Sequence, residues 1–245
     1  MEVSSDLKSA YSGQYSGAEA EWRKLGAKYK ALNIVELAKE LQAQKVCEVG
    51  CGEGSILQWL SDFDFASQLY GIDISKSGIE RTSEKKIKNI VELKIFDGYT
   101  IPYPDKFFDL AVCSHVIEHV EHPRILLREI QRISKKQVFE VPIDFSFYVD
   151  RKAKHYLNYG HINIFTPGLF RFLLLSENFN ILREKNYFYP ADIAKFMHRK
   201  NLVKRFTQGL KQLILKSIPY FRGIKPSSYA VLTEQSNSPV QIMQH

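Results

Sequence analysis

The stretch VCEVGCGEG, from Val46 to Gly54, joins a short apolar segment directly to three glycines at alternate positions. A segment of this length is typical of a buried strand, and the next residues, Ser55 to Leu60, have the apolar spacing of a helix. A strand, a glycine turn and a helix N-terminus form a cradle for a nucleotide-like ligand. The sequence therefore predicts a ligand-binding turn of an α/β fold at this point.

The glycine spacing and one acidic residue bear on the kind of ligand. In dinucleotide enzymes the third glycine follows the second by three residues, because the pyrophosphate lies against the helix start. Here the pattern is compressed to G-x-G-x-G. Glu48, near the end of the strand, would repel phosphates but suits a ligand that carries an ammonium and a sulfonium. A diphosphate ligand is therefore disfavoured.

Three further apolar segments end in polar residues, as expected where the carboxyl ends of parallel strands form a ligand site. The segment 69–74 carries Asp73 at its end, about 20 residues after the loop, where an acid can accept from both ribose hydroxyls. The segment 91–98 ends with Asp97, which can accept from an adenine amino group. The segment 107–113 runs into the polar sequence Ser114 to His119.

In this order the motifs resemble the class I S-adenosylmethionine-dependent methyltransferases. The branch concerned, similar to ubiquinone-biosynthesis-type O-methyltransferases, carries E-x-G-C-G-x-G, an acid ending the second strand, a proline before F-D with an apolar run, and hydrophobic-E-H. The matching residues are Glu48 to Gly54, Asp73, Pro104 to Val112, and Ile117-Glu118-His119. The resemblance covers roughly Lys45 to Asn178. It implies an α/β fold with a Rossmann-like, seven-stranded, mostly parallel sheet, helices on both faces and an antiparallel last strand.

The resemblance also implies S-adenosyl-L-methionine as the cofactor and a set of residues that bind it. Ile74 is expected to flank the adenine, Asp97 and Gly98 to contact its ring edge, and Ser114 to lie beside the methionine part. The full expected set is Glu48, Gly50, Gly52, Gly54, Asp73, Ile74, Asp97, Gly98 and Ser114.

Histidines near the predicted carboxyl edge of the sheet are the candidates for proton transfer. Methyl transfer from a sulfonium is an in-line displacement, so holding the nucleophile and the methyl at attack distance supplies most of the catalysis. A histidine, which titrates near neutral pH, suits removal of a proton from a hydroxyl or amine acceptor. The predicted catalytic residues are His115, His119 and His161, with His115 or His119 preferred as the base. His155 is a further candidate.

His115, Glu118 and His119 together also have the spacing of a metal site. Relatives with E-x-x-E-H at this place, including ubiquinone-biosynthesis O-methyltransferases and plant-type small-RNA 2′-O-methyltransferases, bind a divalent ion. Here His115 stands where the first Glu would be, which disfavours magnesium and favours a softer ion. Glu118 and His119 also occur in metal-free relatives as scaffolding of the turn, so a divalent metal is an alternative that we do not favour.

Composition sets the class of protein. The chain has 245 residues, 44% of them apolar and 13% aromatic, enough for one domain with a sizeable core. Its three cysteines lack C-x-x-C spacing, so neither a disulfide framework nor a zinc site is supported. No basic leader or bilayer-long apolar run is visible, and we expect a cytoplasmic protein.

Charge and periodicity divide the chain into four parts. We expect an N-terminal lid and helix at 1–44, a methyltransferase core at 45–189, a basic helical insert between strands six and seven at 190–227, and the last strand and tail at 228–245. The formal net charge is +7, and residues 190–225 hold the excess, with Asp192 as their single acid. Their basic stripe fits a cap with solvated charges, a peripheral contact with an anionic membrane, or, less well, a surface for nucleic acid.

These features predict an enzyme that transfers a methyl group from S-adenosylmethionine to an oxygen, or nitrogen, of a small or lipid-linked metabolite. Two alternatives remain open: an RNA methyltransferase that holds phosphates with the basic insert, and a cofactor-binding partner subunit without catalytic activity. The aromatic and basic segment Ile143 to Phe165 has no clean period, and we expect it to be a substrate-facing loop.

Overall fold

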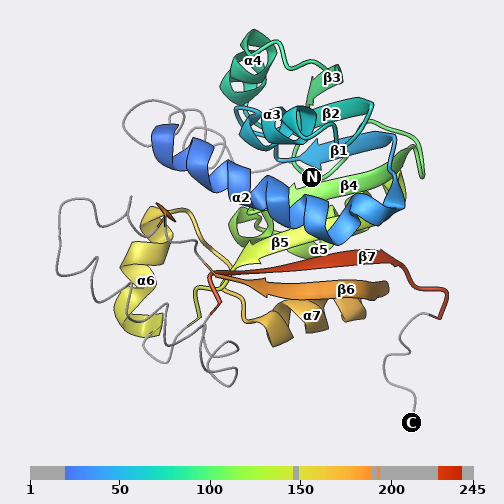
Figure 1. The fold of residues 1–245 in the computed structure, drawn as a ribbon. Helices are drawn as coiled ribbons and strands as arrows, with labels where there is room; N and C mark the ends of the chain where they lie inside the picture. The colour runs from blue at the N-terminus through green and yellow to red at the C-terminus, as the bar shows by residue number, and fades with distance from the viewer. Residues whose placement is uncertain (1–19, 146–148, 189–191, 194–225, 239–245) are drawn as a thin grey trace.

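The computed structural model describes residues 20–145, 149–188, 192–193 and 226–238 (Figure 1). The first 19 residues of the predicted lid and nearly all of the predicted basic insert lie outside this range. The boundaries of those two parts therefore stay predictions.

Seven strands form a single sheet in the order β3-β2-β1-β4-β5-β7-β6. Only β7 runs antiparallel to its neighbours, β5 and β6. The strands are β1 (Lys45–Val49), β2 (Gln68–Asp73), β3 (Ile90–Ile95), β4 (Phe108–Ser114), β5 (Ser134–Pro142), β6 (Phe179–Tyr187) and β7 (Ser228–Gln235). The predicted fold class, with an antiparallel last strand, is confirmed.

Helices cover both faces of this sheet in the described part of the chain. The α-helices are α2 (Ala20–Ala38), α3 (Ser55–Asp62), α4 (Lys76–Glu84), α5 (Pro123–Ile133), α6 (Val149–Asn158) and α7 (Pro167–Ser176), and the short 3-10 helices are η1 (Lys39–Leu41) and η2 (Ile117–His119). The helix α2 crosses one face of the sheet, and α5 and α7 lie on the other (Figure 1).

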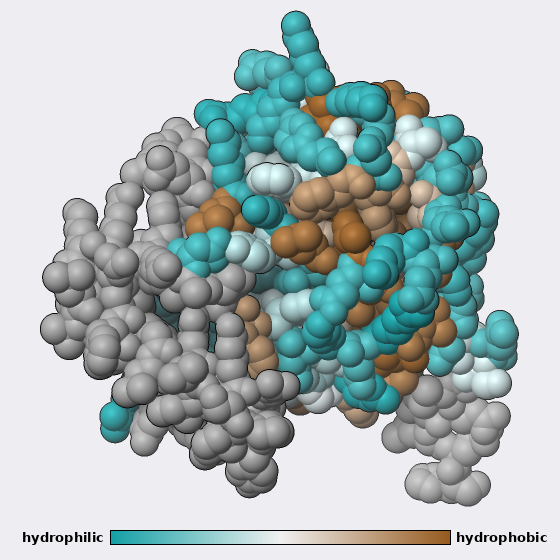
Figure 2. Space-filling view, in the orientation of Figure 1, coloured by the Kyte–Doolittle hydropathy of each residue, from teal (hydrophilic) through white to brown (hydrophobic). Residues whose placement is uncertain are grey.

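The alternation of side chains along the central strands explains the two layers. On β1, Val46 packs in the cluster that contains the buried residues of α2 and α3, whereas Cys47 packs in the cluster of α5 and α7. On β4, Leu110 and Ala111 divide in the same way. Strands that are apolar on both faces need a helix layer on each side, as in other parallel sheets. The face that carries α2 is largely hydrophilic on its outside (Figure 2).

Two local predictions need correction. β3 ends at Ile95 rather than at Asp97, because the chain turns there and the Asp97 carboxylate accepts from two backbone amides that follow it. The expected loop between Ile143 and Phe165 contains α6, a helix that sequence periodicity did not reveal.

No helix within the described ranges combines the length and apolar character needed to cross a membrane.

Candidate functional site

The glycine loop after β1 depends on backbone conformations that other residues rarely adopt. Gly50, Gly52 and Gly54 all have positive φ, at 79°, 53° and 72°. A Cβ on Gly50 would lie 2.4 Å from Val116 Cγ2, and a Cβ on Gly54 would lie 2.4 Å from Thr82 Cγ2. Glycine is therefore required at Gly50 and Gly54 both by conformation and by the close approach of neighbouring side chains.

Asp73, at the carboxyl end of β2, holds the glycine loop from the other side. One carboxylate oxygen accepts from the Gly52 amide at 2.7 Å and the other from the Ser75 amide at 2.8 Å. The residue is buried, and burial raises its pKa although both amides oppose the shift. The structure thus places Asp73 against the loop, as the predicted site requires, and its two backbone partners fix the direction of the carboxylate.

Glu48 lies beneath the same loop in an environment that does not favour a negative charge. The residue is 2% exposed, and its Oε2 has no hydrogen-bond partner. Burial is the main cause that raises its pKa to about 8, and the nearby Asp73 adds to the shift. A buried acid with one unpartnered oxygen at this place is suited to a cationic group that would ionise it.

Asp97 and Gly98, which are predicted to contact the adenine, lie on the turn after β3. Asp97 Oδ1 accepts from the amides of Tyr99 at 2.8 Å and Thr100 at 2.6 Å. Gly98 has a φ of 100°, which permits this tight turn. Ile74, which follows β2, is partly buried and packs against the core cluster.

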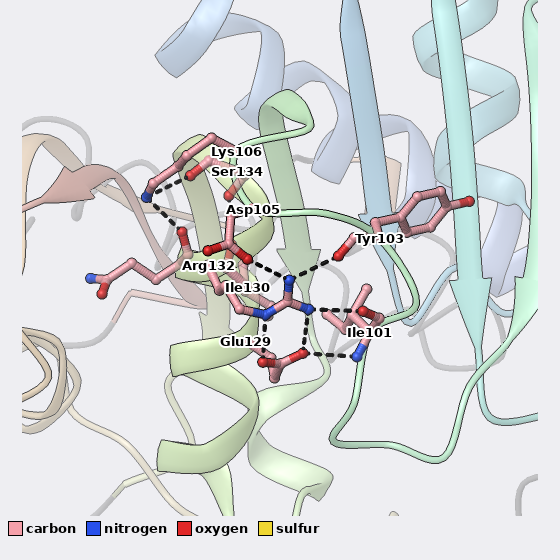
Figure 3. Close-up of polar contacts among 9 residues, drawn as sticks. Ile101, Tyr103, Asp105, Lys106, Glu129, Ile130, Arg132 and Ser134 are labelled. Carbon is pink, nitrogen blue, oxygen red and sulfur yellow. Dashed lines mark hydrogen bonds and ion pairs between the residues drawn. The ribbon is translucent and has the colours of Figure 1, made fainter.

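Arg132, on α5, forms hydrogen bonds with the segment that follows this turn (Figure 3). Its guanidinium donates to the carbonyl oxygens of Ile101 and Tyr103, at 2.9 and 2.8 Å. It also forms a bidentate pair with Glu129, both contacts 2.8 Å, and bonds Asp105 at 2.9 Å. Glu129 in turn accepts from the Ile101 amide at 2.9 Å. The carboxylate partners raise the pKa of Arg132, so this network keeps its charge and holds the turn next to the sheet.

The predicted catalytic histidines gather beyond the carboxyl end of β4. The rings of His119 and His161 lie 4.8 Å apart between centroids. His115 has a φ of 57°, an uncommon value for a residue with a Cβ, and its Nδ1 lies 3.5 Å from Glu118 Oε1. His119 Nε2 lies 3.7 Å from the same oxygen. The structure therefore brings together the three histidines that the sequence singled out.

The hydrogen bonds of His119 and His161 fix which nitrogen carries a proton. A carbonyl oxygen can only accept, so His119 Nδ1, 2.9 Å from Gly160 O, must be the donor and its Nε2 is the basic nitrogen. Burial lowers the pKa of His119, which favours the neutral ring. His161 Nδ1 donates to Asp144 Oδ2 at 2.5 Å. Burial opposes charge on His161, but Asp144 and Glu118 outweigh it and raise its pKa.

Glu118 is the buried centre of this histidine cluster. It is 0% exposed, and neither of its carboxylate oxygens has a hydrogen-bond partner within normal distance. Its backbone carbonyl accepts from the amides of Ile162 and Asn163, at 3.0 and 2.9 Å. The residue therefore has a scaffolding role through its backbone, while its side chain faces the histidines.

Glu140, on β5, is a functional candidate that the sequence analysis missed. It is 1% exposed, and its carboxylate accepts from Asn33 at 2.9 Å, Ser228 at 2.6 Å and Ser114 at 3.2 Å. Burial opposes its ionisation, but His115 and Ser228 outweigh burial and lower its pKa. The signal was an acid inside the apolar run of residues 138–141, which is unusual for a buried strand.

Lys30, on α2, brings a positive charge to the same region. It lies one helical turn before Asn33, and the carboxylates of Glu140, Glu118 and Glu48 all act on its ammonium. Burial is the larger influence and lowers the pKa of Lys30. The helix α2 therefore contributes polar side chains to the site as well as covering it.

The predicted metal set of His115, Glu118 and His119 is not the set that the structure groups most closely. Glu118, His119 and His161 each offer a ligand atom, and these atoms lie within 4.8 Å of one another. Two imidazole nitrogens and one carboxylate suit zinc or a similar borderline ion better than magnesium. These residues fit such an ion, and a divalent metal stays an alternative that we do not favour.

Comparisons with known proteins agree with this geometry. A family model described as a methyltransferase domain matches residues 47–139. The demethylmenaquinone methyltransferase of Thermotoga maritima is 24% identical over 203 residues, which cover 72% of this chain and 84% of that protein. The chain is thus similar to the class I S-adenosylmethionine-dependent methyltransferases.

Two further similarities are consistent with this family. The mitochondrial ubiquinone biosynthesis O-methyltransferase of Candida albicans is 34% identical over 95 residues, covering 36% of this chain and 28% of that protein. A solved S-adenosylmethionine-dependent methyltransferase from Archaeoglobus fulgidus has a TM-score of 0.60 and 21% identity, and the match covers 89% of this chain and 97% of that one. The protein is thus a methyltransferase with S-adenosylmethionine as its cofactor, as predicted. The assignment of individual cofactor-binding residues stays a prediction.

Proposed function

We propose that this methyltransferase transfers the methyl group to an oxygen, or nitrogen, of a small or lipid-linked metabolite, with His119 as the proton acceptor. The observation that carries the proposal is the cluster of His115, His119 and His161 beyond the end of β4. This cluster adjoins Ser114, which is expected beside the methionine part of the cofactor. Relatives named for demethylmenaquinone, tocopherol and ubiquinone biosynthesis support the class of acceptor.

The reaction needs one bond to form, one to break and one proton to move. A lone pair of the acceptor oxygen attacks the methyl carbon, the carbon–sulfur bond breaks, and its electron pair stays on sulfur as S-adenosylhomocysteine. The acceptor proton passes to the basic Nε2 of His119 and then to water. Alignment of the two reactants in a water-poor site supplies most of the rate, and the histidine adds a smaller factor.

His119 suits this role better than the other two rings do. Its lowered pKa keeps the ring neutral at neutral pH, and Nδ1 is committed to Gly160, so Nε2 is the nitrogen that can accept a proton. His161 has a raised pKa and a carboxylate partner, which favour its charged form. We therefore assign proton acceptance to His119 and electrostatic support to His161, while His115 stays the second candidate base.

The acceptor is found by incubating the enzyme and labelled S-adenosylmethionine with metabolite extracts and identifying the labelled product. With that acceptor, we expect His119→Ala to lower kcat about 10²-fold to 10⁴-fold, the usual contribution of a general base. His155, the further candidate for proton transfer, is exposed on α6, so we expect the control variant His155→Ala to keep the parent's kcat. Loss of activity in both variants, or in neither, would reject His119 as the base; product on RNA alone would reject the proposed acceptor class.

A further inference from the structure

The helix α6 lies beyond the carboxyl ends of the parallel strands (Figure 1), and large apolar side chains on it and next to it in the sequence are exposed. Leu157 is 61% exposed, Tyr159 57%, Ile162 45% and Phe145 41%. Four such residues within one short segment are more than scattered surface apolar groups would give, and clustered exposure of this kind marks an interaction site. With Lys152 and Lys154 they form what we call the α6 surface.

The charge of the α6 surface limits the kind of partner. Lys152 and Lys154 are both exposed, and Asp150 is the single acid within the helix. Asp144, which precedes the helix in the sequence, is bound to His161 and therefore contributes little free negative charge. A surface with exposed leucine and isoleucine beside lysines suits an anionic lipid interface, where apolar groups enter the headgroup layer and cations meet lipid phosphates.

Hydrogen bonds connect the same segment directly to the histidine cluster. The amide of His161 donates to Tyr156 O at 3.1 Å, and Gly160 O accepts from His119 at 2.9 Å. The Ile162 amide donates to Glu118 O at 3.0 Å. The exposed apolar side chains of Leu157, Tyr159 and Ile162 thus alternate along the chain with groups that hold the candidate catalytic residues. A partner that binds the α6 surface is brought next to the site.

We propose that the α6 surface docks this methyltransferase on an anionic phospholipid membrane and so presents the histidine cluster to an acceptor embedded in the lipid. The claim about the acceptor rests on the proposed function, whereas the claim about docking does not. Nucleic acid fits the surface less well, since Leu157 and Ile162, unlike Tyr159 and Phe145, cannot stack on bases. The α6 surface does not include the basic segment 190–225, nearly all of which lies outside the described residues.

Vesicle flotation tests the docking without any acceptor. The full chain is mixed with vesicles of phosphatidylcholine containing phosphatidylglycerol, and with vesicles of phosphatidylcholine alone. We expect binding to the anionic vesicles that weakens as salt is added. Replacing both lysines, in K152Q/K154Q, should weaken binding about 25-fold, since each lysine near an anionic surface contributes about fivefold. The variant Leu157→Ser should weaken it about tenfold.

Matched variants elsewhere on the surface serve as controls. Lys76 and Lys88 on and after α4 are 79% and 82% exposed, and Phe172 on α7 is 66% exposed. The variants K76Q/K88Q and Phe172→Ser should bind vesicles as the parent does. Titration with S-adenosylhomocysteine should give the parent's affinity in every variant, which shows that each one is folded.

The outcomes separate docking from the proposed acceptor. The docking proposal is overturned if the parent ignores anionic vesicles, if the α6 variants bind as the parent does, or if the control variants lose binding equally. Retention of single-stranded RNA that K152Q/K154Q loses, without vesicle binding, would assign the surface to nucleic acid instead. Vesicle binding that depends on α6, together with methylation of a water-soluble acceptor only, would keep the docking and reject the lipid-linked acceptor.

Discussion

Replacement of Glu48 by glutamine should remove a pH dependence from both stability and cofactor binding. Burial raises the pKa of Glu48 from an ordinary 4.5 to about 8. The folded protein therefore holds a proton that the unfolded chain has already lost across that interval. Stability must fall as the pH rises from about 4.5 to about 8, and it levels off above that range.

The size of the effect follows from the width of this interval. Each pH unit inside it corresponds to about 1.4 kcal/mol for one titrating group. Raising the pH from 6 to 8 should lower the free energy of unfolding of the parent by about 2 kcal/mol through Glu48, because the group is still half protonated at pH 8. Glu48→Gln has no such proton, so it should lack this decline. Any constant cost of burying the amide cancels when each protein is compared with itself at two pH values.

Cofactor binding should also depend on the ionisation of Glu48. The ammonium of the ligand favours an ionised Glu48, so S-adenosylhomocysteine should release close to one proton when it binds at pH 7. Urea denaturation at pH 6 and 8 measures the stability term, and calorimetric titration in two buffers of different ionisation enthalpy counts the proton. Equal pH dependence of unfolding in parent and Glu48→Gln, or no proton release by the parent, would refute the raised pKa.

Further variants test the loop, the turn and the metal. Gly54→Ala places a Cβ 2.4 Å from Thr82 Cγ2 at a φ of 72°. This variant should weaken S-adenosylhomocysteine binding and cost about 1–3 kcal/mol of stability. The control Gly26→Ala, whose new Cβ has nothing within 4 Å, should be neutral or stabilising in thermal unfolding. Arg132→Met should destabilise by about 2–4 kcal/mol in urea and weaken the same ligand, and Arg132→Lys should lie between. Dialysis against a chelator should leave methyl transfer unchanged, since we do not favour a metal; activity that is lost and then restored by zinc would reverse this expectation.

The fold and the cofactor side of the site could be predicted because local sequence determines them. Three glycines at alternate positions permit the positive-φ turn that other residues rarely adopt, and Asp73 ends a strand whose apolar run is clear without any tertiary contact. Each of these features depends on a few neighbouring residues, so the order of motifs was enough to place them.

The acceptor side could not be predicted because distant segments build it. Glu140 gains its partners from Asn33 on α2 and Ser228 on β7, and their positions depend on the sheet order. The helix α6 was missed because, at ten residues, it is short and has no clean apolar period. The hydroxyl of Tyr156, on α6, donates to Asp144 O at 2.5 Å, and sequence periodicity does not reveal a contact of this kind. Tertiary contacts of this kind decide where short helices form.

The charges around the site should favour release of the product after methyl transfer. Glu48, Asp73, Glu118 and Glu140 are buried acids, and Lys30 is the cation that acts on three of them within the described residues. Such a site is complementary to a ligand with both an ammonium and a sulfonium, because buried acids gain most from positive charge in their neighbourhood. Methyl transfer turns the sulfonium into a neutral thioether and leaves only the ammonium. The product should therefore bind less tightly than the substrate, because the buried acids then face one positive charge instead of two.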